Sequence, residues 1–137
     1  MKTVMFALAA LCLAPAAASA ATSPKDLCPN GQLVTIRFSE IKPTGTKAGF
    51  AKAAADNQAW YVSHGLTQNH QNAGVVLQRN DKGEWTESPN AVVTVHTNPP
   101  GSTAPAPDDA WKAFVAEYDA NSTMKSQTMV CFSQPLR

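Results

Sequence analysis

The sequence carries little net charge and no run of charge of one sign. Its 137 residues include 11 basic and 10 acidic side chains, which gives a formal net charge of +1. A protein that binds the nucleic-acid backbone needs a basic patch or arm, and one that lies on a membrane surface needs a basic amphipathic helix. The sequence has neither, so nucleic acid and membrane surfaces are poor candidates for its partners.

Recognisable catalytic and metal-binding motifs are also missing. The serines lie outside any G-x-S-x-G elbow, and no glycine-rich loop could hold a phosphate group. His64 and His70 are six positions apart, not at the i, i+4 spacing of a helical zinc pair, and no acidic third ligand follows closely. His70 lies in the polar stretch 66–73, which we expect to be a solvated loop. We therefore predict no metal site.

Long apolar runs are absent after the N-terminus. Lys2 is followed by VMFALAALCLAPAA and then by small residues up to Ala20, which is the order of a secretory signal peptide. Pro15 cuts the apolar run short of the roughly 20 residues that a membrane-spanning helix requires. We expect residues 1–20 to be removed, and residues 21–137 to form one secreted or periplasmic domain.

Cysteine is scarce. Cys12 lies in the predicted signal peptide, which leaves only Cys28 and Cys131 in the mature chain. An oxidising compartment favours one disulfide between them. The alternative is two separate thiols, at least one of them simply buried. If the thiols are paired, nucleophilic catalysis by cysteine is a weak hypothesis.

The periodicity of apolar residues predicts four strands and two helices. Residues 33–41 alternate with period two, whereas residues 46–65 repeat at helical spacing up to Gly65, which suits the left-handed position after a helix. A proline-rich stretch then leads to Asp108 and Asp109, which are suited to capping a second, shorter helix. The expected order is strand 33–41, helix 46–65, strand 74–79, strand 91–97, a helix that includes residues 111–118, and strand 123–132.

This order predicts an α+β fold. Two β-α-β units that share a central hairpin make the ferredoxin-like, or split βαβ, arrangement, an antiparallel sheet with both helices on one face. In its usual strand order the last strand lies antiparallel to the first. Cys28 precedes the first strand and Cys131 closes the last, so the fold itself supports the disulfide.

The other face of such a sheet is bare. We expect the first strand to turn Arg37 and its neighbours Leu33, Thr35 and Ile41 toward that face, which is too apolar to be left in water comfortably. A partner subunit is the expected cover. On this face a buried Arg37 would need a carboxylate or a ligand anion, and an exposed or interfacial ion pair is the simpler alternative.

The chain resembles the dimeric α+β barrel superfamily, which includes antibiotic biosynthesis monooxygenase-like domains. The resemblance spans about residues 33–132 and depends on the element order and on the passages VTIRFSEIKP, AWYVSHG, DDAWKAFVAEYDANS and MVCF. More narrowly, the chain is similar to exported members with no assigned function. The resemblance implies a homodimer whose two sheets face each other as a barrel, with pockets between each subunit's helices and sheet. Some relatives oxidise aromatic substrates without a metal cofactor and others degrade haem, so the fold does not choose among activities.

Four residues share one face of the predicted helix 46–65: Asn57, Trp60, Tyr61 and His64. We predict that they line a pocket for an apolar or aromatic small molecule, with residues 99–107 as its rim. If the protein is an oxygenase, cofactor-independent or haem-dependent, His64 and Asn57 would position the substrate. His96, near the end of a strand, could lie at the pocket rim.

Each of these residues also has a purely structural interpretation. Trp60 and Tyr61 could fill the core, and Asn57 could satisfy backbone groups. His64 could bond a carbonyl at the end of its helix. A structural or partner-binding dimer, in which every one of these side chains serves the core or the interface, is therefore a further hypothesis.

Overall fold

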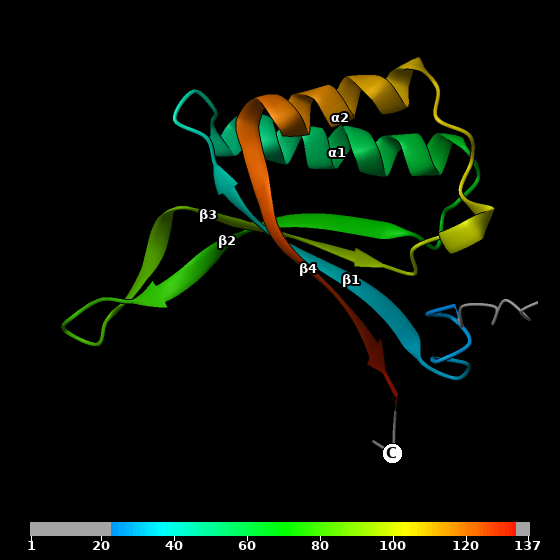
Figure 1. The fold of residues 1–137 in the computed structure, drawn as a ribbon, viewed down its shortest axis with the longest axis horizontal. Helices are drawn as coiled ribbons and strands as arrows, with labels where there is room; N and C mark the ends of the chain where they lie inside the picture. The colour runs from blue at the N-terminus through cyan, green and yellow to red at the C-terminus, as the bar shows by residue number, and fades with distance from the viewer. Residues whose placement is uncertain (1–22, 134–137) are drawn as a thin grey trace, which may run out of the picture.

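A computed structural model of the protein describes residues 23–133 (Figure 1). The predicted signal peptide lies outside the described residues. The elements, in order, are β1 (Gln32–Ile41), α1 (Lys47–Ser63), β2 (His70–Arg79), β3 (Trp85–Thr97), the short 3₁₀ helix η1 (Gly101–Thr103), α2 (Asp109–Asn121) and β4 (Ser122–Phe132). Neither described α-helix has the length and apolar character needed to cross a membrane.

The four strands form one antiparallel sheet in the order β2-β3-β1-β4. Both α-helices lie side by side on the same side of this sheet, and the β2–β3 hairpin projects beyond them (Figure 1). The protein is therefore α+β, and its arrangement is compatible with the ferredoxin-like fold expected from the order of its elements.

The hairpin strands are longer than the sequence pattern predicted. β2 begins at His70 rather than Gly74, and β3 begins at Trp85 rather than Ala91. Strands pair through backbone hydrogen bonds, so polar residues such as Gln71 can extend a strand. Such residues add nothing to the apolar alternation from which we predicted the strand bounds. The prediction that His70 lies in a loop was wrong for this reason. Pro89 is tolerated inside β3 because it lies where the register between the two strands shifts.

The first helix ends as its sequence predicted. Gly65 has a φ of +78°, and His64 is the C-cap residue. The backbone N–H of Gly65 bonds the carbonyl of Val62, and the N–H of Leu66 bonds the carbonyl of Tyr61. These two bonds form a Schellman motif, whose usual apolar contact is supplied by Leu66 packed against the aromatic core.

The beginning of α1 is attached to the end of α2. The Thr46 side chain caps α1 by accepting from the N–H of Gly49, while the Thr46 N–H donates to Asn121 Oδ1 at 2.9 Å. A Cβ at Gly49 would overlap that Asn121 amide, so this position requires glycine for close approach rather than for φ. The two helices are therefore held together at this end by a buried asparagine.

The predicted disulfide is present. Cys28 and Cys131 are bonded across 103 residues of sequence, with their Cα atoms 5.6 Å apart. A Cβ at Gly31 would lie 2.7 Å from both sulfur atoms, so the turn before β1 has room only for glycine. The bond attaches the segment before β1 to the end of β4.

The expected orientation of β1 was wrong. Thr35, Arg37 and Ser39 face the helices, because Ser39 and Arg37 share a cavity with residues of both helices and Thr35 has the same strand parity. Ile36 and Phe38 face the open side, where Phe38 is 45% exposed. The alternation along β1 was assigned to the wrong faces, because we expected its apolar side chains to face the helices. The space beneath the helices is instead lined by aromatic side chains from the helices and by polar side chains from the strands.

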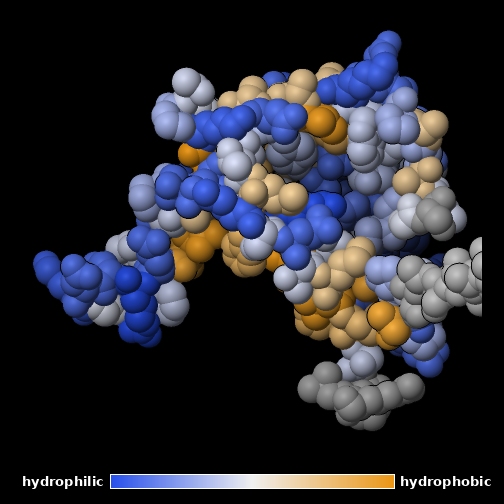
Figure 2. All heavy atoms as spheres, viewed as in Figure 1, coloured by the Kyte–Doolittle hydropathy of each residue, from blue (hydrophilic) through white to orange (hydrophobic). Residues whose placement is uncertain are grey.

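The open side of the sheet is rich in apolar residues. Ile36 is paired with Val95, and Phe38 with Val93, while Phe132 near the end of β4 is 57% exposed. Hydrophobic atoms gather between the hairpin and the body of the molecule and over the lower ends of the strands (Figure 2). An apolar sheet face of this kind is typical of an interaction surface.

Candidate ligand cavity between the helices and the sheet

A cavity of about 290 Å³ lies between the two helices and the sheet. The helices supply aromatic walls from Phe50, Tyr61, Trp111, Phe114 and Tyr118, and the strands supply mainly polar side chains: Arg37, Ser39, Gln71, Thr94 and His96. A mostly apolar hollow with a few convergent polar groups is the usual form of a small-molecule site. We call this hollow the helix–sheet cavity.

A chain of side-chain hydrogen bonds crosses one wall of the cavity. Asn57 Nδ2 donates to Gln71 Oε1 at 3.0 Å, and Gln71 Nε2 donates to the Tyr118 hydroxyl oxygen. The Tyr118 oxygen is thus used as an acceptor, which leaves its own O–H free to donate. The other atom of the Asn57 amide, Oδ1, is buried and has no hydrogen-bond partner among the described residues.

The two tyrosines of the cavity remain protonated across the ordinary pH range. Burial raises the pKa of Tyr118 to about 12, although hydrogen bonds from Asn57 and Gln71 and the charge of Arg37 oppose this shift. Burial also raises the pKa of Tyr61, again against the charge of Arg37. Both hydroxyls therefore act as neutral donors and not as phenolates.

Arg37 brings a positive charge to the sheet side of the cavity. Its Nε donates to the Gln127 side-chain oxygen at 2.7 Å, and no carboxylate of residues 23–133 forms an ion pair with it. The acidic side chain that lines the same cavity, Asp119, is exposed at its edge. The guanidinium is left with donors that a ligand could use.

His96 lies deep on the sheet side. It is 3% exposed, its Nε2 bonds Asn69 Oδ1, and its ring centroid lies 5.1 Å from that of Tyr61. Burial, helped by the charge of Arg37, lowers the pKa of His96 to about 4. The ring is therefore neutral at ordinary pH. Donation from Nε2 to Asn69 leaves the other ring nitrogen with its lone pair.

The predicted set Asn57, Trp60, Tyr61 and His64 does not line one pocket. Asn57 and Tyr61 line the helix–sheet cavity together with Arg37 and His96. Trp60 and His64 line a separate groove of about 400 Å³ between α1 and α2. The rim expected from residues 99–107 is not part of the cavity lining.

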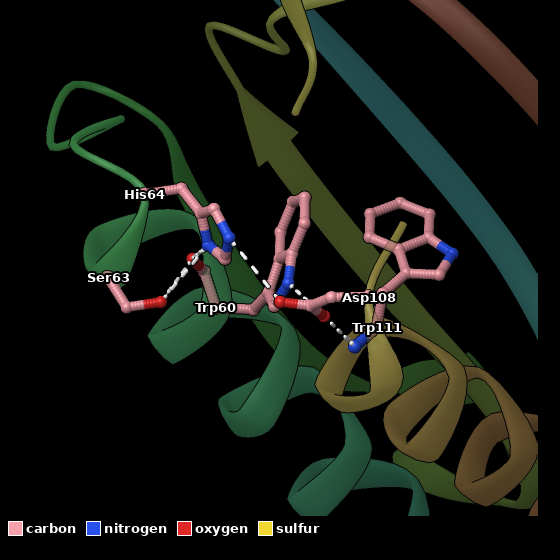
Figure 3. Close-up of polar contacts among 5 residues, drawn as sticks. All are labelled: Trp60, Ser63, His64, Asp108 and Trp111. Carbon is pink, nitrogen blue, oxygen red and sulfur yellow. Dashed lines mark hydrogen bonds and ion pairs between the residues drawn. The ribbon is translucent and has the colours of Figure 1, made fainter. Parts of the chain in front are cut away.

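His64 is held at the end of α1 by bonds to its neighbours (Figure 3). Its Nδ1 lies 2.8 Å from the Trp60 carbonyl oxygen, and its Nε2 lies 3.4 Å from Asp108 Oδ2. Its ring also packs against the Trp60 indole, with centroids 4.3 Å apart. This geometry matches the structural interpretation of His64, a helix-terminal side chain bonded to a carbonyl.

Ser63, His64 and Asp108 have the residue types of a hydrolase triad without its geometry. The Ser63 hydroxyl donates to the Trp60 carbonyl oxygen at 2.8 Å. The same carbonyl oxygen lies 2.8 Å from His64 Nδ1. Nδ1 must carry a proton to bond that carbonyl, so it cannot accept the serine proton. The cluster therefore joins the helices and does not activate a nucleophile.

Three polar residues of the site were missed by the sequence analysis. Gln71 and Asn69 lie in the stretch taken for a loop, and Tyr118 was placed only on the apolar face of the second helix. The available signal was chemical: a tyrosine hydroxyl on a buried face needs a polar partner. Gln71 alternates with Ala73 and Val75 as a strand residue, but that pattern is weak.

Haem does not fit the helix–sheet cavity. A volume of about 290 Å³ is at the small end of ligand pockets and suits a single aromatic ring rather than a porphyrin. His64 faces the groove between the helices, and the buried His96 is bonded to Asn69. Within residues 23–133, no cluster of three or more histidine, cysteine, aspartate or glutamate side chains could hold a metal ion.

Comparisons of the chain with protein-family models, curated proteins and solved structures find no match.

Proposed function

We propose that the protein is a small exported homodimer of the dimeric α+β barrel type, and that it binds a small aromatic molecule in the helix–sheet cavity. The observation that carries this proposal is the cavity itself. Aromatic rings from both helices line it together with Arg37, whose terminal nitrogens have no partner among residues 23–133, and with the Tyr118 hydroxyl, which accepts from Gln71 and can still donate. A purely structural interior would be expected to pair such groups or to replace them by apolar ones.

The open face of the sheet supports the dimer. Ile36, Phe38, Val93 and Val95 share this face, and Phe38 is 45% exposed in the single chain. A second copy that packed its own sheet against this face would bury these side chains in an isologous interface. This second copy would leave the helix–sheet cavity free, because the cavity lies on the opposite side of the sheet.

The disulfide supports export. Cys28 and Cys131 are bonded, and such bonds persist mainly in secreted and periplasmic proteins. The apolar N-terminal stretch predicted as a signal peptide would supply the route.

An oxygenase activity remains a second hypothesis, but not in the form that the sequence predicted. His64 lies outside the helix–sheet cavity. A reaction there would have to use Arg37, His96 or Tyr118 instead.

The binding proposal is tested by titrating the purified protein with phenol in a calorimeter. We expect Thr94→Leu, which projects a larger side chain into the cavity, to abolish binding. Val93→Leu, on the open side of the same strand, should retain it, and so should Ala59→Leu, which fills the separate groove. If no single-ring probe binds, or if Ala59→Leu removes binding and Thr94→Leu does not, the proposal is wrong.

A further inference from the structure

The helix–sheet cavity contains a cation that the described part of the chain does not neutralise. Arg37 projects from β1 toward the helices and bonds Gln127 through Nε alone. Its terminal nitrogens have no hydrogen-bond or ion-pair partner among residues 23–133. A partly buried guanidinium without an acceptor is costly, and a planar carboxylate is the group that best matches its paired donors.

The nearby hydroxyl of Tyr118 adds a second donor. Its oxygen accepts from Gln71, so its hydrogen is free to donate to a ligand. Arg37 and Tyr118 line the same cavity. Both groups can therefore offer hydrogens to an anionic ligand bound there.

Much of the remaining cavity wall is aromatic. Phe50 and Phe114 line the cavity, as do Tyr61 and Trp111, and rings of this kind pack against a planar ligand edge-on or offset. A volume of about 290 Å³ leaves room for one ring with short substituents.

We propose that the helix–sheet cavity selects a single-ring aromatic monocarboxylic acid, with its carboxylate on Arg37 and Tyr118. This inference depends on the proposed binding function and specifies its ligand class. A neutral phenol would fill the same walls but leave the guanidinium unpaired.

The test compares two probes of the same shape, 4-hydroxybenzoate and 4-hydroxybenzamide, by calorimetric titration. We expect the acid to bind the native protein about tenfold or more tightly than the amide. Arg37→Gln should remove that preference, because it weakens binding of the acid far more than binding of the amide. Arg79→Gln, which changes an exposed arginine of the hairpin, should keep the preference.

Equal binding of the acid and the amide, unaltered in Arg37→Gln, would overturn the carboxylate assignment and leave the binding function in place. Binding of neither probe, together with no binding of phenol, would overturn both.

Discussion

Asp108 accepts the indole N–H of Trp60 at 2.8 Å and so joins the first residue before α2 to the last turns of α1 (Figure 3). The same carboxylate caps α2 through the backbone N–H of Trp111, also at 2.8 Å. The bond from Trp111, and then the one from Trp60, holds the pKa of Asp108 below its usual value although burial opposes this. One exposed carboxylate thereby fixes how the helices lie above the cavity.

This relationship predicts that the side chain of Asp108 contributes more to the stability of the protein than that of Asp109. We expect Asp108→Ala to lower Tm by several degrees, because it removes a helix cap and a helix–helix bond together. Asp108→Asn, which keeps an acceptor oxygen, should have a Tm between that of Asp108→Ala and that of the native protein. Asp109→Ala is the control, since the Asp109 side chain is 98% exposed. Equal melting temperatures for the two alanine variants would show that the bond to Trp60 has little effect.

The neutral buried His96 predicts an acid-sensitive fold. Its pKa is about 4 in the folded protein against an ordinary 6.5, so below pH 6.5 the unfolded chain binds a proton that the folded chain excludes. The stability that the neutral His96 contributes to the folded protein is fully present above pH 6.5 and is lost as the pH falls toward 4. Between pH 7 and pH 4.5 we expect the free energy of unfolding to fall by about 2–3 kcal/mol from this residue.

Urea titrations at both pH values measure this effect. The fall in the free energy of unfolding between pH 7 and pH 4.5 should be about 2–3 kcal/mol smaller in His96→Asn than in the native protein. His70→Gln, a change at an exposed histidine, should behave like the native protein. A pH dependence of the same size in the native protein and His96→Asn would contradict the assignment.

The disulfide predicts a large stability difference between oxidised and reduced protein. The bond closes a loop of 103 residues, for which chain entropy gives about 4–5 kcal/mol as an upper estimate. We expect reductant to lower the urea midpoint of the native protein. A double variant, Cys28→Ala with Cys131→Ala, should have the reduced protein's midpoint and no response to reductant. Titration of free thiols in protein purified from its natural source should find neither cysteine reactive.

The open sheet face predicts the oligomeric state. Light scattering should give twice the mass of one mature chain, and Phe38→Glu should give the single mass, because it places a charge in the proposed interface. Val62→Glu is the matched control: Val62 is 50% exposed on α1, away from that face. A native protein that is monomeric at micromolar concentration would refute the dimer.

Much of the fold could be predicted because its signals are local. The stripe of residues 50–61, the cap at Asp108 and the glycine after α1 each follow from backbone sterics or side-chain spacing. The pairing of Cys28 with Cys131 followed from the small number of cysteines in a chain expected to be exported, and the expected strand order supported it. These features need no knowledge of distant contacts.

The site was harder to predict because it depends on which face of each strand is covered. Alternation along β1 separates Arg37 from Phe38 but does not say which of them faces the helices. The helix pattern likewise placed Asn57 and His64 on one face, although His64, about two turns further along α1, lines another groove. Gln71 and Tyr118 became visible as site residues only through the hydrogen bond between them.

The most direct measurement is a nitrogen–proton correlation spectrum of the labelled protein during titration with 4-hydroxybenzoate. The side-chain amide signals of Asn57 and Gln71, which lie in the wall of the helix–sheet cavity, should shift progressively and saturate, while the indole signal of Trp60 stays near its place. Shifts confined to Trp60 and residues around His64, or a spectrum unchanged at millimolar ligand, would contradict the cavity as the binding site.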